Sequence, residues 1–110
     1  MPLIFHNIGI PVEKSKLTAK CRYSSLFKMY SEDVENDLDI RKEYHAFDTG
    51  GPLDTRLQNL PHIAFKTNNI EKDLLNKEII MLLYEPFKGY CCAVIVLNGV
   101  VIELIETKLT

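Results

Sequence analysis

The strongest local signal in this chain is a pair of apolar segments at its C-terminal end. The segments Tyr90–Leu97 and Val100–Thr107 are rich in β-branched residues and are separated only by Asn98 and Gly99. An Asn-Gly pair between two apolar runs is typical of a two-residue hairpin turn, because both residues accept the positive φ angles that such a turn requires. The pattern therefore predicts a β-hairpin and a strand-rich fold.

Shorter apolar segments predict further strands in the rest of the chain. They are Ile4–Pro11, Tyr23–Tyr30, Asp39–Asp48, Pro61–Thr67 and Ile79–Tyr84. One helix is predicted to begin after Asn68, which forms a capping-box pattern with Glu71, and to end near Lys77. The expected class is α+β, mostly strand, with one helix.

Length and composition limit the classes of protein to which the chain can belong. Its 110 residues fit one domain, and 46% hydrophobic with 25% charged residues is ordinary globular composition. A net charge of -2 gives no electrostatic reason to expect nucleic acid or an anionic membrane as a partner. Neither nucleic acid nor a membrane is therefore expected as a partner.

The location is inferred from segments that the sequence lacks. No apolar run approaches the ~18–20 residues of a membrane span, and the N-terminal residues do not have the pattern of a signal peptide. The cysteines are Cys21, Cys91 and Cys92, a set that forms neither a disulfide scaffold nor a CxxC zinc site. A reduced, cytoplasmic protein is expected.

The chain also contains an internal repeat of two halves, about 1–56 and about 57–110. His6 and His62 each come directly before or at the start of an apolar strand, one in each half. Each half ends in a strand with a central carboxylate, Glu43 in the first and Glu103 in the second. Two such halves related by a pseudo-twofold axis would bring all four side chains to one place.

These four side chains form a mixed nitrogen and oxygen ligand set. Imidazole and carboxylate together suit a borderline divalent ion such as Zn, Ni, Co, Fe or Mn. Glu103 supports this interpretation, because it lies between Ile102 and Leu104 on an apolar strand, where a carboxylate is costly unless it is paired or bound to a metal. The sequence therefore predicts a divalent metal site.

The chain resembles the vicinal oxygen chelate superfamily, which includes glyoxalase I, methylmalonyl-CoA epimerase, extradiol dioxygenases and bleomycin-resistance proteins. The resemblance covers nearly all of the second half and, in the first half, the first strand and the segment around 42–53. The segments that carry it best are His6–Val12, Leu60–Leu74, Glu85–Tyr90 and Asn98–Thr107.

The resemblance implies a fold of two β-rich βαβββ-type modules. Together they would form one cupped, mixed, mostly antiparallel sheet around a concave site. In this chain the first module is shortened, because only Glu13–Arg22 is available for the helix after the first strand. Many members of the superfamily are homodimers, so a homodimer is also expected.

The resemblance further implies a set of metal ligands and a chemistry. The ligands would be His6, His62 and Glu103, with Glu43 as the fourth and His45 as its alternative. Glu103 or Glu43 would act as the catalytic base of a metal-dependent isomerase or lyase. Such an enzyme stabilises the enediolate or enolate of a small oxo-compound or thioester.

Two other functions remain open at the level of sequence. One is a metal-free binding module that resembles the bleomycin-resistance proteins, with Tyr44, Phe47 and Phe87 lining the cup. The other is a non-haem dioxygenase that uses His6, His62 and Glu103 as its ligands. Metal content would separate the first of these from the metal-dependent enzyme.

Overall fold

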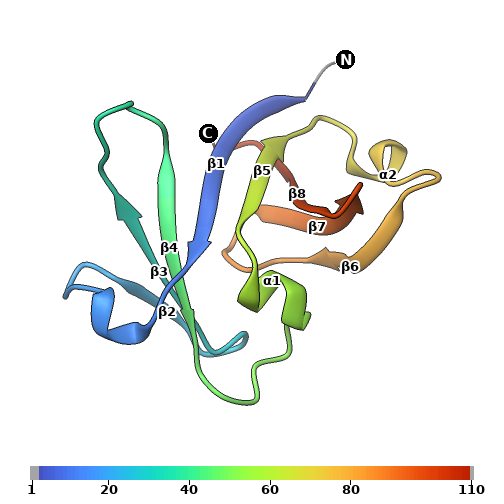
Figure 1. The fold of residues 1–110 in the computed structure, drawn as a ribbon. Helices are drawn as coiled ribbons and strands as arrows, with labels where there is room; N and C mark the ends of the chain where they lie inside the picture. The colour runs from blue at the N-terminus through green and yellow to red at the C-terminus, as the bar shows by residue number, and fades with distance from the viewer. Residues whose placement is uncertain (1–2, 110) are drawn as a thin grey trace.

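The computed structural model describes residues 3–109, which form one eight-stranded sheet with three short helical segments (Figure 1). The strands are β1 Ile4–Pro11, β2 Arg22–Ser24, β3 Met29–Val34, β4 Lys42–Phe47, β5 His62–Lys66, β6 Glu78–Tyr84, β7 Tyr90–Leu97 and β8 Val100–Thr107. The helical segments are the 3₁₀ turn η1 Lys14–Lys16 and the helices α1 Thr55–Asn59 and α2 Ile70–Asp73. The strand-rich α+β class predicted from the sequence is confirmed.

The strand connectivity is the same in the two halves of the chain. The order across the sheet is β2-β3-β4-β1-β5-β8-β7-β6, so β1 and β5 lie side by side at its centre (Figure 1). In each half the central strand pairs in parallel with the last strand, and the remaining pairs are antiparallel. β1 and β5 are themselves antiparallel. The result is a mixed sheet in which antiparallel pairs predominate.

The sheet is strongly curled, because side chains from its two opposite edges touch. The guanidinium of Arg22 on β2 lies 5.6 Å from the ring centre of Phe87, which follows β6. Phe27, in the turn after β2, packs edge-on against Tyr84 of β6, with ring centres 5.7 Å apart. Both contacts join strands that stand at opposite ends of the strand order. The sheet therefore forms a half-barrel with a concave inner face.

Three predicted elements are shorter than expected, and in each case a residue with positive φ lies within the predicted range. Asp39 has a φ of 56°, and the strand expected over 39–48 begins at Lys42 and ends at Phe47. Lys28 has a φ of 52°, so the single strand expected over 23–30 is divided into β2, a turn and β3. Asn76 has a φ of 59°, and α2 ends at Asp73 instead of extending to Lys77. Left-handed backbone cannot continue a strand or a helix.

The short helix α1 was not predicted, and it fills one end of the half-barrel. Asp54 caps it by accepting a hydrogen bond from the backbone N–H of Arg56 at 2.9 Å. Leu57 on the helix and Leu53 before it are buried with side chains of both halves, Phe27, Met29, Val94 and Val101. This apolar packing closes one end of the concave face and leaves the rest of it open.

The outer face of the sheet is covered differently in the two halves. In the second half, Ile70 and Leu74 of α2 pack on Leu104. In the first half the turn η1 is the helical segment between β1 and β2. An extended segment also lies there, held by a hydrogen bond of 2.7 Å from the backbone N–H of Thr18 to the Glu32 carboxylate.

The helices of the model are short. Within residues 3–109, no helix has the length and apolar character that crossing a bilayer requires.

Candidate functional site

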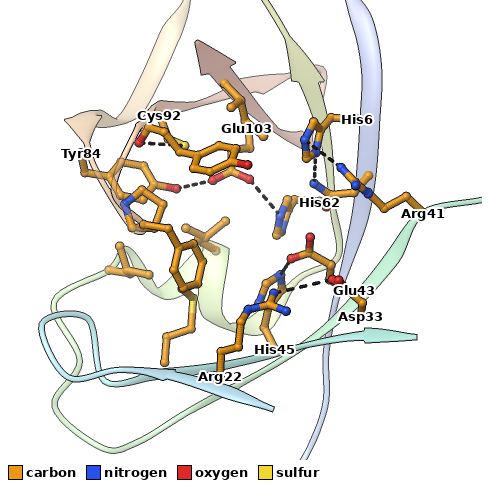
Figure 2. A pocket seen from close by; sticks show the side chains of 18 of the residues that line it. His6, Arg22, Asp33, Arg41, Glu43, His45, His62, Tyr84, Cys92 and Glu103 are labelled. Carbon is orange, nitrogen blue, oxygen red and sulfur yellow. Dashed lines mark hydrogen bonds and ion pairs between the residues drawn. The ribbon is translucent and has the colours of Figure 1, made fainter. Parts of the chain in front are cut away.

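The concave face encloses a cavity of about 370 Å³, a size in the range of small-molecule sites. Its walls come from both halves of a single chain, and Figure 2 shows their side chains converging on the interior. Five of its lining residues are those predicted as ligands, namely His6, Glu43, His45, His62 and Glu103. The fold therefore brings the predicted site residues to one cavity.

The second half contributes a His–Glu pair to the cavity. His62 Nε2 lies 3.5 Å from Glu103 Oε1, and the Tyr84 hydroxyl donates a 2.7 Å hydrogen bond to Glu103 Oε2. Burial disfavours the charged form of Glu103, but the His62 and Tyr84 hydrogen bonds and the charge of His62 outweigh it, so its pKa is lowered. Glu103 is therefore held as a carboxylate.

The first half contributes the corresponding pair, Glu43 and His45, on neighbouring positions of the same face of β4. His45 Nε2 lies 3.5 Å from Glu43 Oε1, and His45 Nδ1 lies 2.9 Å from Ser31 Oγ. Burial, followed by the nearby His62, lowers the pKa of His45 to about 4. Burial and the nearby charge of Asp33 raise the pKa of Glu43. The two glutamates of the cavity are thus shifted in opposite directions.

The two pairs meet across β1, where a glycine makes room for them. Gly9 lies opposite Glu43 on β4 and opposite His62 on β5. A Cβ atom at Gly9 would overlap the His62 ring. The His45 and His62 rings are stacked with their centres 5.6 Å apart. A side chain at position 9 would therefore block the approach of the two pairs.

The pairing of β1 with β5 corrects the predicted equivalence of His6 and His62. Asn7 lies opposite Ala64, and Gly9 lies opposite His62. A pseudo-twofold axis that relates the two halves therefore places Asn7 at the position of His62, and Gly9 at the position of Ala64. Asn7, and not His6, is the counterpart of His62, and the sequence alignment of the halves was wrong by one residue.

The parallel strand pairs give the same correspondence. Gly9 lies opposite Glu43, as Ala64 lies opposite Glu103. The two glutamates are therefore equivalent, as the repeat predicted. A β-bulge between Phe5 and Asn7 displaces the start of β1 relative to β5, which is where His6 lies.

His6 lies at the rim of the cavity, held by Arg41 and Asn7 (Figure 2). Arg41 Nη1 donates to His6 Nε2 at 3.1 Å, and the Asn7 side-chain amide lies 2.7 Å from His6 Nδ1. Burial and the positive charge of Arg41 lower the pKa of His6. Both ring nitrogens are thus occupied within the protein. Arg41 lies near Glu43 in sequence, but its side chain contacts His6.

The side chains of this cavity that could coordinate a metal are of the types that divalent ions bind. They are two carboxylates and two buried imidazoles, and Asn7 also lines the cavity. Among residues 3–109, the buried atoms Asn7 Oδ1 and His62 Nδ1 have no hydrogen-bond partner. In the same part of the chain, no group of three or more His, Cys, Asp or Glu side chains already surrounds a common point. Binding a metal would therefore require Glu43 and Glu103 to turn toward one ion.

Sequence reasoning missed Asn7 and Tyr84 and misplaced His6 and Tyr44. Asn7 carried no signal, because a lone asparagine on a strand is ordinary. Tyr84 ends the apolar segment of β6, where a hydroxyl-bearing ring is typical of a buried side chain that needs a polar partner. Tyr44, expected in the cup, instead alternates with Glu43 and His45 and faces the outer side of β4. Phe47 and Phe87 do line the cavity.

Comparison with known proteins supports the fold. No family model matches this chain, and no curated protein matches it. The solved structure of a hypothetical protein, BH1468, from Bacillus halodurans C-125 is similar, with a TM-score of 0.74 and 17% sequence identity. The match covers 100% of this chain and 98% of that chain. At this level of identity the similarity concerns the fold alone.

Proposed function

We propose that this protein is a divalent-metal-dependent isomerase or lyase of the vicinal oxygen chelate type, resembling glyoxalase I and methylmalonyl-CoA epimerase. Its substrate would be a small oxo-compound or thioester with two neighbouring oxygens. The observation that carries the proposal is the meeting of two His–Glu pairs, one from each half, in one cavity.

The metal would be held by His62, Glu103 and Glu43, with the Asn7 carbonyl oxygen at the position expected for a second histidine. His45, whose Nε2 lies 3.5 Å from Glu43 Oε1, would orient the Glu43 carboxylate. Among residues 3–109, the buried atoms His62 Nδ1 and Asn7 Oδ1 have no hydrogen-bond partner. This supports the binding of a further group beside them. A bound divalent ion would supply Lewis-acid polarisation of the substrate oxygens.

The two glutamates are suited to different parts of a proton transfer. Glu103 is kept as a carboxylate by His62 and Tyr84, which suits it to accept a proton from the carbon beside a carbonyl. Glu43 has a raised pKa, which suits it to return a proton. Opposite pKa shifts on two neighbouring carboxylates are a general means of separating the acid from the base.

A second function is favoured by the residues at the rim. Asn7 stands in place of a histidine, and Arg41 places a positive charge against His6. Both features weaken a metal site. A metal-free binding module that resembles the bleomycin-resistance proteins is therefore the second proposal. The dioxygenase is less favoured, since two of its three expected ligands were His6 and His62, and His6 is bonded within the protein.

The first experiment is a titration of chelator-treated protein with Ni²⁺, Zn²⁺ and Mn²⁺, followed by calorimetry and elemental analysis. One equivalent of metal is expected to bind to the wild type. His62→Ala should weaken binding by at least about tenfold, because it removes a direct ligand. The matched control is His6→Ala, a histidine of the same cavity that should leave the affinity within about twofold.

The same proteins are then assayed for turnover of a 2-oxoaldehyde hemithioacetal and of an acyl-CoA thioester. Glu103→Gln should lower turnover by on the order of 10²-fold while the protein still folds, because a base is replaced by its neutral isostere. Protein that takes up none of the three metals would contradict the metal-dependent enzyme and support the binding module. Full turnover in His62→Ala would contradict both the ligand set and the mechanism.

We also propose that the protein forms a homodimer, as the resemblance implies. Both halves of one chain contribute side chains to the lining of the cavity. Dissociation to monomers would therefore be expected to preserve ligand binding, which sedimentation analysis at several concentrations can test.

A further inference from the structure

The two walls of the cavity differ sharply in polarity, although they are equivalent by topology. Glu43 lies opposite Asp33, whereas its counterpart Glu103 lies opposite Val94. Two residues further along these strands, His45 lies opposite Ser31, whereas its counterpart Ile105 lies opposite Cys92. The first half therefore presents polar and charged groups at positions where the second half presents apolar ones.

Apolar residues extend this second wall toward the closed end of the half-barrel. Leu53 and Leu57 near α1 line the cavity there, together with Phe87 after β6. A ligand with an apolar body and a polar end therefore fits the cavity, with its apolar body toward α1 and Phe87 and its polar end toward Arg41.

Arg41 is the charged group at the polar end that is least satisfied within the protein. Among residues 3–109 it takes part in no ion pair, and its only side-chain hydrogen bond is to His6. The other arginine of the lining, Arg22, has Asp33 at 3.6 Å and lies over Phe87. A guanidinium has five N–H donors in a planar fork that matches a carboxylate, so Arg41 keeps most of its binding capacity.

The charge of the lining also favours an anionic ligand once a metal is present. Two arginines and three carboxylates line the cavity, Arg22, Arg41, Asp33, Glu43 and Glu103. Counting these five side chains alone, this leaves one excess negative charge. A bound divalent ion would turn that excess into one positive charge, which a monoanion neutralises.

From these observations we propose that the ligand of this cavity is a carboxylate with an apolar, for example aromatic, body, and that Arg41 recognises the carboxylate. The proposal rests on the proposed function for the reacting end of the site, and it adds the class of substrate. Arg41 is thereby a specificity-determining residue at the rim.

The test compares 3-phenylpropanoate with 3-phenylpropanamide, which have the same size and differ in charge. Binding of each is measured by calorimetry to chelator-treated protein and to Ni²⁺-loaded protein. The acid should bind the loaded protein at least about tenfold more tightly than the amide, as expected for one charge-assisted hydrogen-bonded pair. Arg41→Gln should abolish this preference, and Arg41→Lys should retain part of it because it keeps the charge but loses the fork.

The matched control is Lys42→Gln, which removes the same charge one residue away. Lys42 lies on the outer face of β4, with its Nζ 5.2 Å from the ring centre of Tyr44. It should leave the acid preference unchanged. Circular dichroism and Ni²⁺ affinity establish that each variant is folded.

The outcomes separate this inference from the proposed function. An acid preference that persists in Arg41→Gln would mean that the metal binds the carboxylate, and it would overturn the role of Arg41. Equal binding of acid and amide, or no binding of the acid at millimolar concentration, would overturn the substrate class. Protein that takes up no metal but still shows an acid preference dependent on Arg41 would support the inference and contradict only the metal-dependent enzyme.

Discussion

At the residue scale, the absence of a side chain at Gly9 is as important as the presence of the ligands. Gly9 sits between Glu43 and His62, and a Cβ there would overlap the imidazole ring. The ring cannot move freely, since His62 is 6% exposed and its Nε2 faces Glu103. The glycine therefore sets the position of His62.

Gly9→Ala is expected to destabilise the protein by about 1–3 kcal/mol, the usual cost of overpacking a well-packed interior. It should also weaken metal binding, because it displaces the His62 ring. Urea denaturation measures the stability. In the double variant with His62→Ala the overlap is gone, so the cost of Gly9→Ala should largely disappear. Strict additivity of the two changes would contradict this explanation.

A second residue-scale prediction concerns the pH dependence of stability through His45. Burial lowers its pKa from 6.5 to about 4. Above pH 6.5 the folded and unfolded forms are both neutral, so the shift has no effect. As the pH falls below 6.5, the unfolded chain binds a proton that the folded chain refuses, and the folded state loses stability. The full loss, near pH 4, is on the order of 3 kcal/mol.

The measurement is urea denaturation of chelator-treated protein between pH 7 and pH 5. The lowered pKa of Glu103 acts only at lower pH, as its carboxylate takes up a proton, and so contributes little in this window. His45→Gln should show a flatter stability curve than the wild type. An equally steep curve in the variant would assign the loss to another group.

At the element scale, the short helix α1 decides how much of the half-barrel is core and how much is cavity. It has only five residues and depends on tertiary packing and the Asp54 cap, because an isolated helix of this length is unstable. Leu57 is 4% exposed and packs with side chains of both halves. The helix thus forms the closed end of the ligand site.

Leu57→Ala is expected to cost about 2–5 kcal/mol, because the void left in a rigid apolar cluster is only partly refilled. Thermal or urea unfolding measures the loss, and the enlarged cavity should accept bulkier apolar ligands. Leu60→Ala is the matched control on the end of the same helix, since Leu60 is 43% exposed. A similar loss for both variants would mean that α1 is not anchored through Leu57.

At the scale of the whole molecule, the pseudo-twofold arrangement holds for the strand order and strand register and is incomplete in the side chains. The strand order and register of the two halves correspond, and the glutamates occupy equivalent positions. Asn7 stands where the second half has His62, and Arg41 stands where it has Val101. The two halves therefore share a strand arrangement and differ in the side chains that they present to the cavity.

This arrangement makes a direct prediction about metal affinity. Asn7→His places a second imidazole at the position equivalent to His62, so Ni²⁺ affinity should rise by on the order of tenfold. His6→Ala, one residue away, should leave it within about twofold. Calorimetric titration of both variants measures the difference. A loss of affinity in His6→Ala with no gain in Asn7→His would restore the register expected from the sequence.

The sequence by itself determined the strands with clear patterns and the residue types of the site. The bounds of β1, β7 and β8 agree with those predicted, because β-branched runs and the Asn98-Gly99 turn are local signals. The equivalence of Glu43 and Glu103 was also visible in the repeat. These features depend on neighbouring residues or on a repeated pattern, and both can be read along one chain.

Only the tertiary structure decided the register and the contacts between distant strands. A shift of one residue moves every side chain of a strand to the other face, and the bulge before Asn7 produces such a shift without any turn signal. The Tyr84–Glu103 hydrogen bond, the Arg41–His6 hydrogen bond and the room left by Gly9 all depend on strands far apart in sequence. Their geometry arises from the curl of the sheet, which no local segment specifies.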